Sequence, residues 1–334
     1  MLVYVLALDD VFDLGLSAIL DTLGTANELA AMAPEESGPD FEVVLVGVRA
    51  RVHTSQGLTV PVEAAAKLRR PDVVIVPALG AKMPDTIAAA LERRDIADAR
   101  RVLNMWAEGG TRTCSACGGT FVVASAGLLD GCAATTTWWL APLFRERFPK
   151  VSLDESQMVV VSGECVTAGA ALAHVDLALW LVRRRSPALA SLVARYLLID
   201  PRPSAAVYAI ADHLQHADVM VERFETWARD TLSTPFSLEA AARRVGTSPR
   251  TLTRRMKKVL GKTPLSYVQD LRVQRAVHLL RTSDAGVDEV AAHVGYKDGV
   301  TLRTLLRKKT GLGIKQLRRD WGEKRTAESA PGGR

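Results

Sequence analysis

The stretch SLEAAARRVGTSPRTLTRRMKKVLGKTP, residues 237–264, has a counterpart in VDEVAAHVGYKDGVTLRTLLRKKTG, residues 287–311. Each stretch begins with a short alanine-rich segment, passes a glycine (Gly246 or Gly295) and a polar turn, and ends in a basic segment closed by a second glycine. Between them, residues 264–281 space their apolar side chains like a single helix crossing a core. The pattern predicts an all-α domain in which two helix–turn–helix units are joined by a longer helix.

The two basic segments have an apolar back and a polar front. Leu252, Met256 and Leu260 recur every four residues and predict the buried stripe of the first helix. Leu302, Leu305 and Leu306 are expected to face inward in the second. Ser248 is a suitable N-cap for the first helix, with Pro249 at its first position.

A helix with an Arg and Thr front suits the major groove of DNA, because Arg pairs bidentately with guanine and Thr contacts a thymine methyl or a phosphate. The residues expected to read bases are Arg250, Thr253 and Arg254 in the first helix and Val300, Thr301, Arg303 and Thr304 in the second. Phosphate contacts are expected from Lys257, Lys258, Arg307 and Lys308. The alternatives are solvated charged faces of an ordinary helical domain, or a scaffold whose basic helices bind an acidic protein; the repeated pattern favours DNA.

The charge distribution agrees with binding to a phosphate backbone. Residues 236–325 contain 21 Lys and Arg against 8 Asp and Glu, a net charge of +13. Since the whole chain carries +6, the remainder carries −7. A basic module therefore follows an acidic one.

Residues 237–319 resemble the DNA-binding domain of AraC-type transcriptional regulators. The resemblance rests on residues 238–280, on VDEVAAHVGY at 287–296, and on the Gly311–Arg318 tail with its Leu-Arg ending. In that family two recognition helices enter successive major grooves of double-stranded DNA. The second unit departs from the family pattern: Leu302 and Leu306 replace the usual Phe, Ile314 the usual Pro, and Leu317 the usual Tyr.

The first half of the chain alternates apolar strands with helices. Continuous apolar runs predict strands at residues 2–8, 40–48, 71–77, 111–116 and 157–161. Helices are expected at residues 13–31, 85–104, 120–129, 138–148 and 168–183. This order predicts a doubly wound, mostly parallel, flavodoxin-like α/β sheet covered on both faces, with ligands at the carboxyl ends of its strands.

Residues 1–195 resemble the ThiJ/PfpI superfamily, which has a glutamine-amidotransferase-like fold. The matching segments are SACGGTFVVASAGLLDG (residues 115–131), ATTTWW (134–139) and VTAGAALAHVDLALWLV (166–182). In catalytic members the cysteine of the strand–helix turn is a nucleophile, flanked by an acid from the first helix and a histidine. The resemblance places Cys117 at the nucleophile and Asp21 at the acid, whereas Thr137 occupies the histidine position.

Without an imidazole to move protons, a cysteine nucleophile lacks its usual base. We therefore expect no catalytic residues, and a ligand pocket formed by Asp21, Cys117, Gly118 and Thr137. The alternative is a cysteine-dependent hydrolase or deglycase with an attached nucleic-acid-binding module.

Cys114 and Cys117 form a C-x-x-C pair, a spacing that is also found in zinc sites and in redox-active disulfides. No second pair or paired histidine completes a zinc site, so we expect neither a metal nor a cofactor. A reversible Cys114–Cys117 disulfide is left as a hypothesis.

Composition and local sequence signals predict the location of the protein and its domain boundaries. The start of the chain lacks a signal peptide and no stretch is long enough to span a bilayer, so a bacterial cytoplasmic protein that contacts no membrane is expected. The expected domains are 1–195, a helical connector at 196–230, the DNA-binding domain at 231–322 and a disordered tail at 323–334. The resemblances imply a small-molecule effector, RNA polymerase and a second copy of the chain as further partners, the last forming a homodimer.

Overall fold

The computed structural model describes residues 1–32, 41–200, 216 and 218–318. The chain divides into two compact units, Met1–Ala205 and Ala206–Arg334. Each unit has its own cores and is described by itself.

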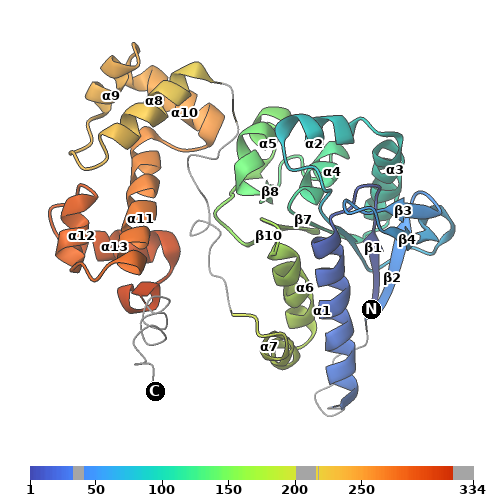
Figure 1. The fold of residues 1–334 in the computed structure, drawn as a ribbon. Helices are drawn as coiled ribbons and strands as arrows, with labels where there is room; N and C mark the ends of the chain where they lie inside the picture. The colour runs from blue at the N-terminus through green and yellow to red at the C-terminus, as the bar shows by residue number, and fades with distance from the viewer. Residues whose placement is uncertain (33–40, 201–215, 217, 319–334) are drawn as a thin grey trace, which may run out of the picture. The chain divides into compact units, whose positions relative to one another are not determined.

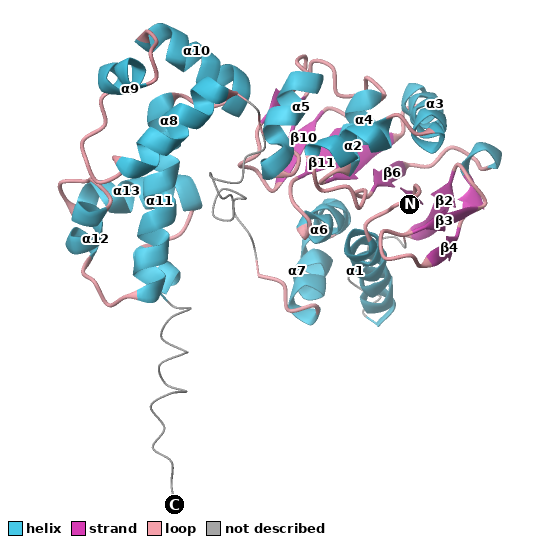
Figure 2. Ribbon diagram, turned by 45° about the horizontal axis from the view of Figure 1, so that its top comes forward, coloured by secondary structure: helices cyan, strands magenta, loops and turns pink. Residues whose placement is uncertain are grey.

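The described part of the first unit is built on a seven-stranded sheet of order β10-β11-β7-β6-β1-β2-β5 (Figure 2). Adjacent strands are parallel, except that β10 at one edge runs antiparallel to β11. The main parallel strands lie in the flavodoxin-like order, so the predicted fold class is confirmed. The strands of the sheet are β1 (Leu2–Leu6), β2 (Glu42–Gly47), β5 (Glu63–Ala64), β6 (Val73–Val76), β7 (Arg112–Ala116), β10 (Val159–Ser162) and β11 (Cys165–Ala168).

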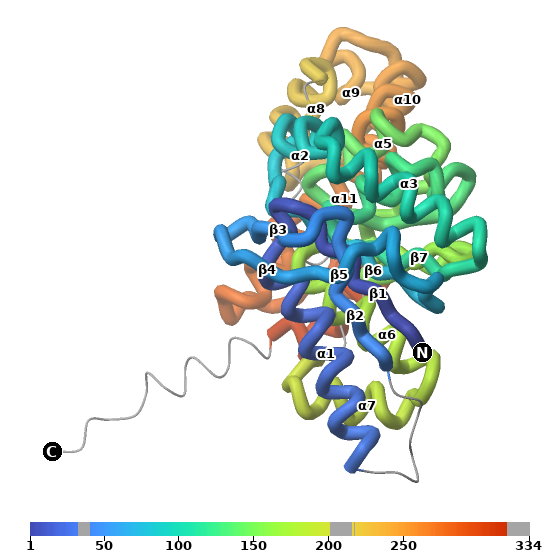
Figure 3. Tube along the Cα trace, turned by 90° about the vertical axis from the view of Figure 1, so that its right-hand side faces the viewer, coloured from blue at the N-terminus to red at the C-terminus, as the bar shows by residue number. Residues whose placement is uncertain are grey.

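Helices cover both faces of the sheet because its strands are apolar on both sides. Val3 and Val5 of β1 face one core, and Leu2, Tyr4 and Leu6 face the other. The first face is covered by α1 (Asp13–Met32), α6 (Ala173–Arg185) and α7 (Pro187–Tyr196). The second is covered by α2 (Pro84–Leu91), α3 (Arg94–Glu108), α4 (Gly119–Ser125) and α5 (Ala141–Arg147). Figures 1 and 3 show α1 and α3 on opposite sides of the strands.

Two predicted helices differ from the structure. The single helix expected at residues 85–104 is two helices, because Arg93 adopts an extended conformation between α2 and α3. The helix expected to begin at residue 168 begins at Ala173, and the β-prone residues before it form strand β11. Short elements that the sequence did not predict are β3 (Arg51–His53), β4 (Thr59–Pro61), β9 (Ser152–Leu153) and the 3-10 helix η2 (Ala65–Lys67). The strand β8 (Ala133–Ala134) lies where the sequence predicts a short extended segment, residues 132–136, and the helix expected at 138–148 begins as the 3-10 helix η3 (Trp138–Leu140).

The second unit is helical throughout its described residues and has two cores on one long helix. Its helices include α8 (Val219–Asp230), α9 (Leu238–Arg244), α10 (Pro249–Leu260), α11 (Pro264–Thr282), α12 (Val287–His293) and α13 (Gly299–Thr310). The amino-terminal half of α11 packs with α8, α9 and α10, and its carboxyl-terminal half packs with α12 and α13 (Figure 1). The two predicted helix–turn–helix units and their joining helix are confirmed.

The basic helices begin and end at the residues that the sequence predicts. The Ser248 hydroxyl accepts a hydrogen bond from the Thr251 N–H at 3.2 Å, and Pro249 is the first residue of α10. Gly261 and Gly311 end α10 and α13 in the left-handed conformation, with φ of 69° and 73°. Glycine adopts that conformation at little cost, which explains its place at both helix ends.

Some predictions fall outside the described residues. They are the first part of the helical connector, residues 201–215, and the disordered tail at 323–334. Within the described ranges, no helix has the length and continuous apolar character needed to cross a bilayer.

Candidate functional site

Helix α10 presents a basic surface to solvent over an apolar back. Leu252, Met256 and Leu260 are buried in the core as predicted. The side chains of Arg250, Arg254, Lys257 and Lys258 are exposed. Thr253 is half-buried, and its hydroxyl donates to the Pro249 carbonyl at 2.9 Å, which leaves its methyl group as the part available to a partner.

Helix α13 has the same layout with fewer charges. Leu302 and Leu306 are fully buried, whereas Leu305 is only partly buried. Six side chains predicted to contact DNA are exposed: Val300, Thr301, Arg303, Thr304, Arg307 and Lys308. Val300 is 66% exposed although it is apolar, which suits contact with a thymine methyl.

The threonine hydroxyls of α13 are used inside the helix. Thr301 donates to the Asp298 carboxylate at 3.2 Å, and Thr304 donates to the Val300 carbonyl at 3.1 Å. These two residues therefore present methyl groups outward, and the basic residues of α13 supply its charged donors.

Arg272 of α11 connects the two helix–turn–helix units. Its guanidinium donates to the Leu232 carbonyl at 3.1 Å and to the Thr234 carbonyl at 2.5 Å, and it stacks on the Tyr296 ring with a centroid distance of 4.9 Å. Gly295 must be glycine here, because it has φ of 82° and a Cβ would lie 2.7 Å from the Arg272 guanidinium. The role of Arg272 was not predicted from the sequence, since an arginine in an amphipathic helix is usually exposed.

Arg255 is the second residue that sequence reasoning left unassigned. Its guanidinium forms an ion pair with Asp218, the N-cap of α8. Burial alone would raise the pKa of Asp218, but the N–H of Val221 and the Arg255 guanidinium outweigh burial and lower it. The available signal was an aspartate directly before an apolar helical run.

In the first unit, Cys117 lies at the sharp turn between β7 and α4 with φ of 53°. Its N–H donates to the Ala168 carbonyl at 2.8 Å, and its carbonyl accepts from the Thr136 hydroxyl at 2.7 Å. Cys117, Gly118 and Thr137 are buried together at this turn. Three of the four predicted pocket residues are thus adjacent.

Asp21 does not join them. Its side chain is exposed on α1, whereas the residue of this helix that packs against the neighbouring His174 is Gly15. Six residues of α-helix advance about 9 Å and rotate Asp21 about 120° away from the face of Gly15. The structure therefore does not bring Asp21 to the turn that gathers the other three predicted pocket residues.

The electrostatics of the turn keep the thiol protonated. Burial raises the pKa of Cys117 to about 11, although the Gly118 N–H, Thr137 and the charge of Lys82 act in the opposite direction. His174 is fully buried, and burial lowers its pKa to about 4. Its Nε2 accepts from the Ala78 N–H at 3.1 Å while Nδ1 contacts the Ala171 carbonyl at 2.5 Å, so both ring nitrogens are engaged.

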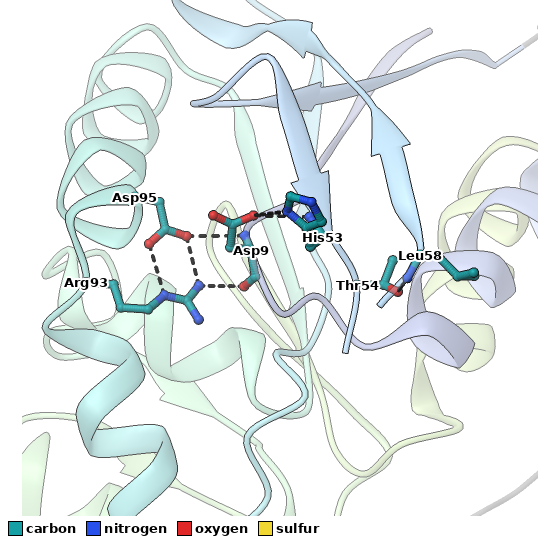
Figure 4. A network of polar contacts seen from close by, with 6 residues as sticks. All are labelled: Asp9, His53, Thr54, Leu58, Arg93 and Asp95. Carbon is teal, nitrogen blue, oxygen red and sulfur yellow. Dashed lines mark hydrogen bonds and ion pairs between the residues drawn. The ribbon is translucent and has the colours of Figure 1, made fainter. Parts of the chain in front are cut away.

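Charged residues at the carboxyl end of β1 bind one another. Figure 4 shows Arg93 contacting both Asp95 oxygens, at 3.0 and 2.8 Å, and the Asp9 carbonyl at 2.5 Å. The Asp9 carboxylate in turn accepts from the His53 N–H at 3.1 Å. This network fixes the extended Arg93 that separates α2 from α3.

Among the described residues, no group of three or more His, Cys, Asp or Glu side chains is arranged to hold a metal ion.

The geometry defines a two-part class of protein: a doubly wound α/β domain with a buried cysteine turn, followed by a double helix–turn–helix domain. A family model described as the DJ-1/PfpI family matches residues 1–184, and a model described as a helix-turn-helix domain matches residues 241–320. Since the first match covers more than half of the chain, the protein belongs to the DJ-1/PfpI family. Its second domain is of the AraC type, so both resemblances are confirmed.

Relatives with established names are transcription regulators. The activator RhaS of Escherichia fergusonii is 35% identical over 104 residues, covering 31% of this chain and 37% of the relative. The regulator CdhR of Pseudomonas aeruginosa is 29% identical over 184 residues, covering 54% of each chain. The matches therefore span about half or less of these relatives.

The α/β fold also has a solved counterpart. A protein from Vibrio parahaemolyticus, described as a proposed transcriptional regulator, has a TM-score of 0.50 and 20% identity. The match covers 59% of this chain and 98% of that chain. At this identity the similarity concerns the fold alone.

Proposed function

We propose that this protein is a sequence-specific, double-stranded DNA-binding transcription regulator of the AraC type. The observation that carries the proposal is the pair of basic helices, α10 and α13, packed on opposite halves of α11. The 19 residues of α11 span about 28 Å, which is close to one turn of B-DNA. Two basic helices packed on the two halves of a helix of that length suit successive major grooves on one face of a duplex.

Within this proposal, Arg250, Thr253, Arg254, Val300, Thr301, Arg303 and Thr304 read base edges. Lys257, Lys258, Arg307 and Lys308 bind phosphates. The exposure of the basic members supports these roles, and the internal hydrogen bonds of the threonines favour contact through their methyl groups.

The first unit is proposed to sense a small molecule and to dimerise, without catalysing a reaction. Three features support a non-catalytic role: the protonated Cys117 thiol, Thr137 at the position of the family's histidine, and the engaged, neutral His174. A bacterial cytoplasmic location and contact with RNA polymerase complete the proposal by analogy with the named regulators.

The test is a titration of the full-length protein with a random duplex at several salt concentrations, in the presence and absence of a hydrolase substrate series. Salt-dependent DNA binding with no turnover is the expected result. Turnover that disappears in a Cys117→Ser variant would replace the proposal with a cysteine-dependent hydrolase or deglycase.

A further inference from the structure

A cleft of about 520 Å³ lies within the second unit, between the start of α8 and one edge of α10. Its lining includes Arg254, Arg255 and Lys258 of α10, together with Asp218 of α8. The cleft thus gathers three cations against one carboxylate.

The edge of α10 that lines this cleft is distinct from the centre of its exposed face. Thr251, Arg255 and Lys258 follow one another at intervals of four and three residues, so they lie along one side of the helix. An α-helix with its side chains is about as wide as the major groove, so a helix seated in the groove has its sides against the phosphate backbones that form the walls. The cleft is therefore placed where one DNA strand would pass.

The single carboxylate in the cleft is already neutralised. The Asp218 side chain is 8% exposed; it accepts from the N–H groups of Met220 and Val221 at 3.1 Å and binds Arg255 through Nε. Arg255 is 50% exposed, and this contact leaves its terminal nitrogens free of the carboxylate. A guanidinium held by one nitrogen keeps donors for a phosphate oxygen in a fixed direction.

We infer that this cleft seats one DNA backbone phosphate, that Arg255 and Lys258 bind it, and that Asp218 is the positioning residue that holds Arg255. The inference rests on the proposed function and deepens it, because it adds Arg255 and Asp218 to the DNA interface and names their ligand. It also explains why α8 belongs to the DNA-binding unit: it supplies the residue that orders an arginine of the recognition helix.

The first test compares Arg255→Gln and Lys258→Gln with Arg195→Gln, an equal charge change at an exposed residue of α7 in the first unit. We expect each cleft variant to lower affinity roughly tenfold, equally on specific and random duplexes, and to flatten the salt dependence by about one counterion. The control should leave the salt slope unchanged. Wild-type slopes in both cleft variants would overturn the phosphate seat.

The second test examines Asp218. Asp218→Asn keeps an oxygen that can cap α8 but removes the charge that holds Arg255. We expect it to weaken binding, and to add little to the loss already caused by Arg255→Gln. A gain in affinity would show that Asp218 only repels phosphate, and fully additive losses would show that it acts independently of Arg255; either result overturns the positioning role.

Phosphate ethylation interference locates the contact without relying on variant stability. On the wild-type protein one ethylated phosphate beside the block read by α10 should block binding, and that interference should vanish in a variant that carries both Arg255→Gln and Lys258→Gln. Persistence of the interference would contradict the seat. If the wild-type protein selects no sequence at all, the proposed regulator fails instead, while the salt slopes on random DNA still decide whether the cleft binds phosphate.

Discussion

Within the proposed DNA-binding function, we expect Arg254 to identify a base, because it is exposed on α10 opposite the buried stripe of Leu252, Met256 and Leu260. We expect Arg254→Ala to cost about 1–3 kcal/mol on the selected duplex and to relax preference at one base pair. Competition binding with duplexes substituted at each position measures both effects. Equal losses on specific and random DNA would assign Arg254 to phosphate binding.

The reactivity of Cys117 distinguishes a sensor from an enzyme. With a pKa of about 11, only about one thiol in ten thousand is ionised at pH 7. Labelling by iodoacetamide should therefore be at least about a hundredfold slower than labelling of free cysteine. Mass spectrometry follows each thiol separately, with the partly exposed Cys132 as an internal control. Labelling of Cys117 faster than free cysteine would restore the enzymatic alternative.

The same burial bears on the redox hypothesis. Burial raises the pKa of Cys114 to about 12, so both members of the C-x-x-C pair are held as thiols. Because thiolates are the species that oxidise, the structure disfavours rapid formation of a Cys114–Cys117 disulfide. The hypothesis stays a prediction, and unchanged DNA affinity under peroxide and under reductant would dispose of it.

His174 gives the first unit a pH-dependent stability. Its pKa is about 4 when folded and about 6.5 when unfolded, so the unfolded state binds a proton first as the pH falls. The contribution of neutral His174 is therefore complete above pH 6.5 and is lost as the pH falls towards 4. Between pH 7 and pH 5 we expect a loss of about 2 kcal/mol.

Hydrogen exchange of the α1 and α6 amides across this pH range measures the loss. A His174→Gln variant is the matched control, since it retains every other titrating group of the chain. The difference between the two pH profiles should carry the predicted slope, and parallel profiles would show that His174 does not contribute.

At the scale of elements, α11 depends on Arg272 to hold both helix–turn–helix units. Arg272→Ala removes two hydrogen bonds from a cation and its stacking on Tyr296, so we expect a loss of about 3 kcal/mol or more. Arg272→Lys should recover less than half of that loss, because an ammonium group lacks the planar fork.

Local hydrogen exchange in α9 and α12 reports whether both units are affected. Arg275→Ala, at an exposed position of the same helix, should change stability by less than about 0.5 kcal/mol. If Arg272→Ala loosened only one unit, its bridging role would be refuted.

Elements with a strong periodic pattern were predictable from the sequence. The stripe of Leu252, Met256 and Leu260, the Ser248 cap and the closing glycines placed α10 correctly, because each signal is local. Strand β11 was missed because the helix was expected to begin at residue 168, although Gly169 separates the strand from α6, which begins at Ala173. The break at Arg93 was missed because the contact of its guanidinium with the Asp9 carbonyl joins residues 84 apart in the chain and leaves no local signal.

In the candidate site too, the positions that follow from helical periodicity were predictable, and the contacts between distant residues were not. Exposed positions on α10 and α13 follow from helical periodicity, and all the basic ones are exposed as predicted. Asp21 was placed by analogy alone, and the structure puts it on the surface of α1. The Asp218–Arg255 pair joins residues 37 apart in sequence, so no periodicity within either helix could reveal it.

At the scale of the whole molecule, the charge separates by unit. Residues 206–334, the helical unit, contain 24 Lys and Arg against 14 Asp and Glu, a net +10, whereas residues 1–205 contain 19 against 23, a net −4. Attraction to DNA is therefore concentrated in the helical unit, and the α/β unit is repelled by phosphates. This division suits a protein in which one domain binds nucleic acid and the other is left free for an effector or a second copy of the chain.

Sequence-specific recognition by α10 and α13 is best measured by selecting binding sites from a random duplex pool with the full-length protein. We expect a motif with two blocks about 10 base pairs apart, one lost in Arg254→Ala and the other in Arg303→Ala. A single block would mean that α13 binds phosphates only. Recovery of no motif, with weak binding to every sequence, would contradict sequence-specific recognition by the two helices.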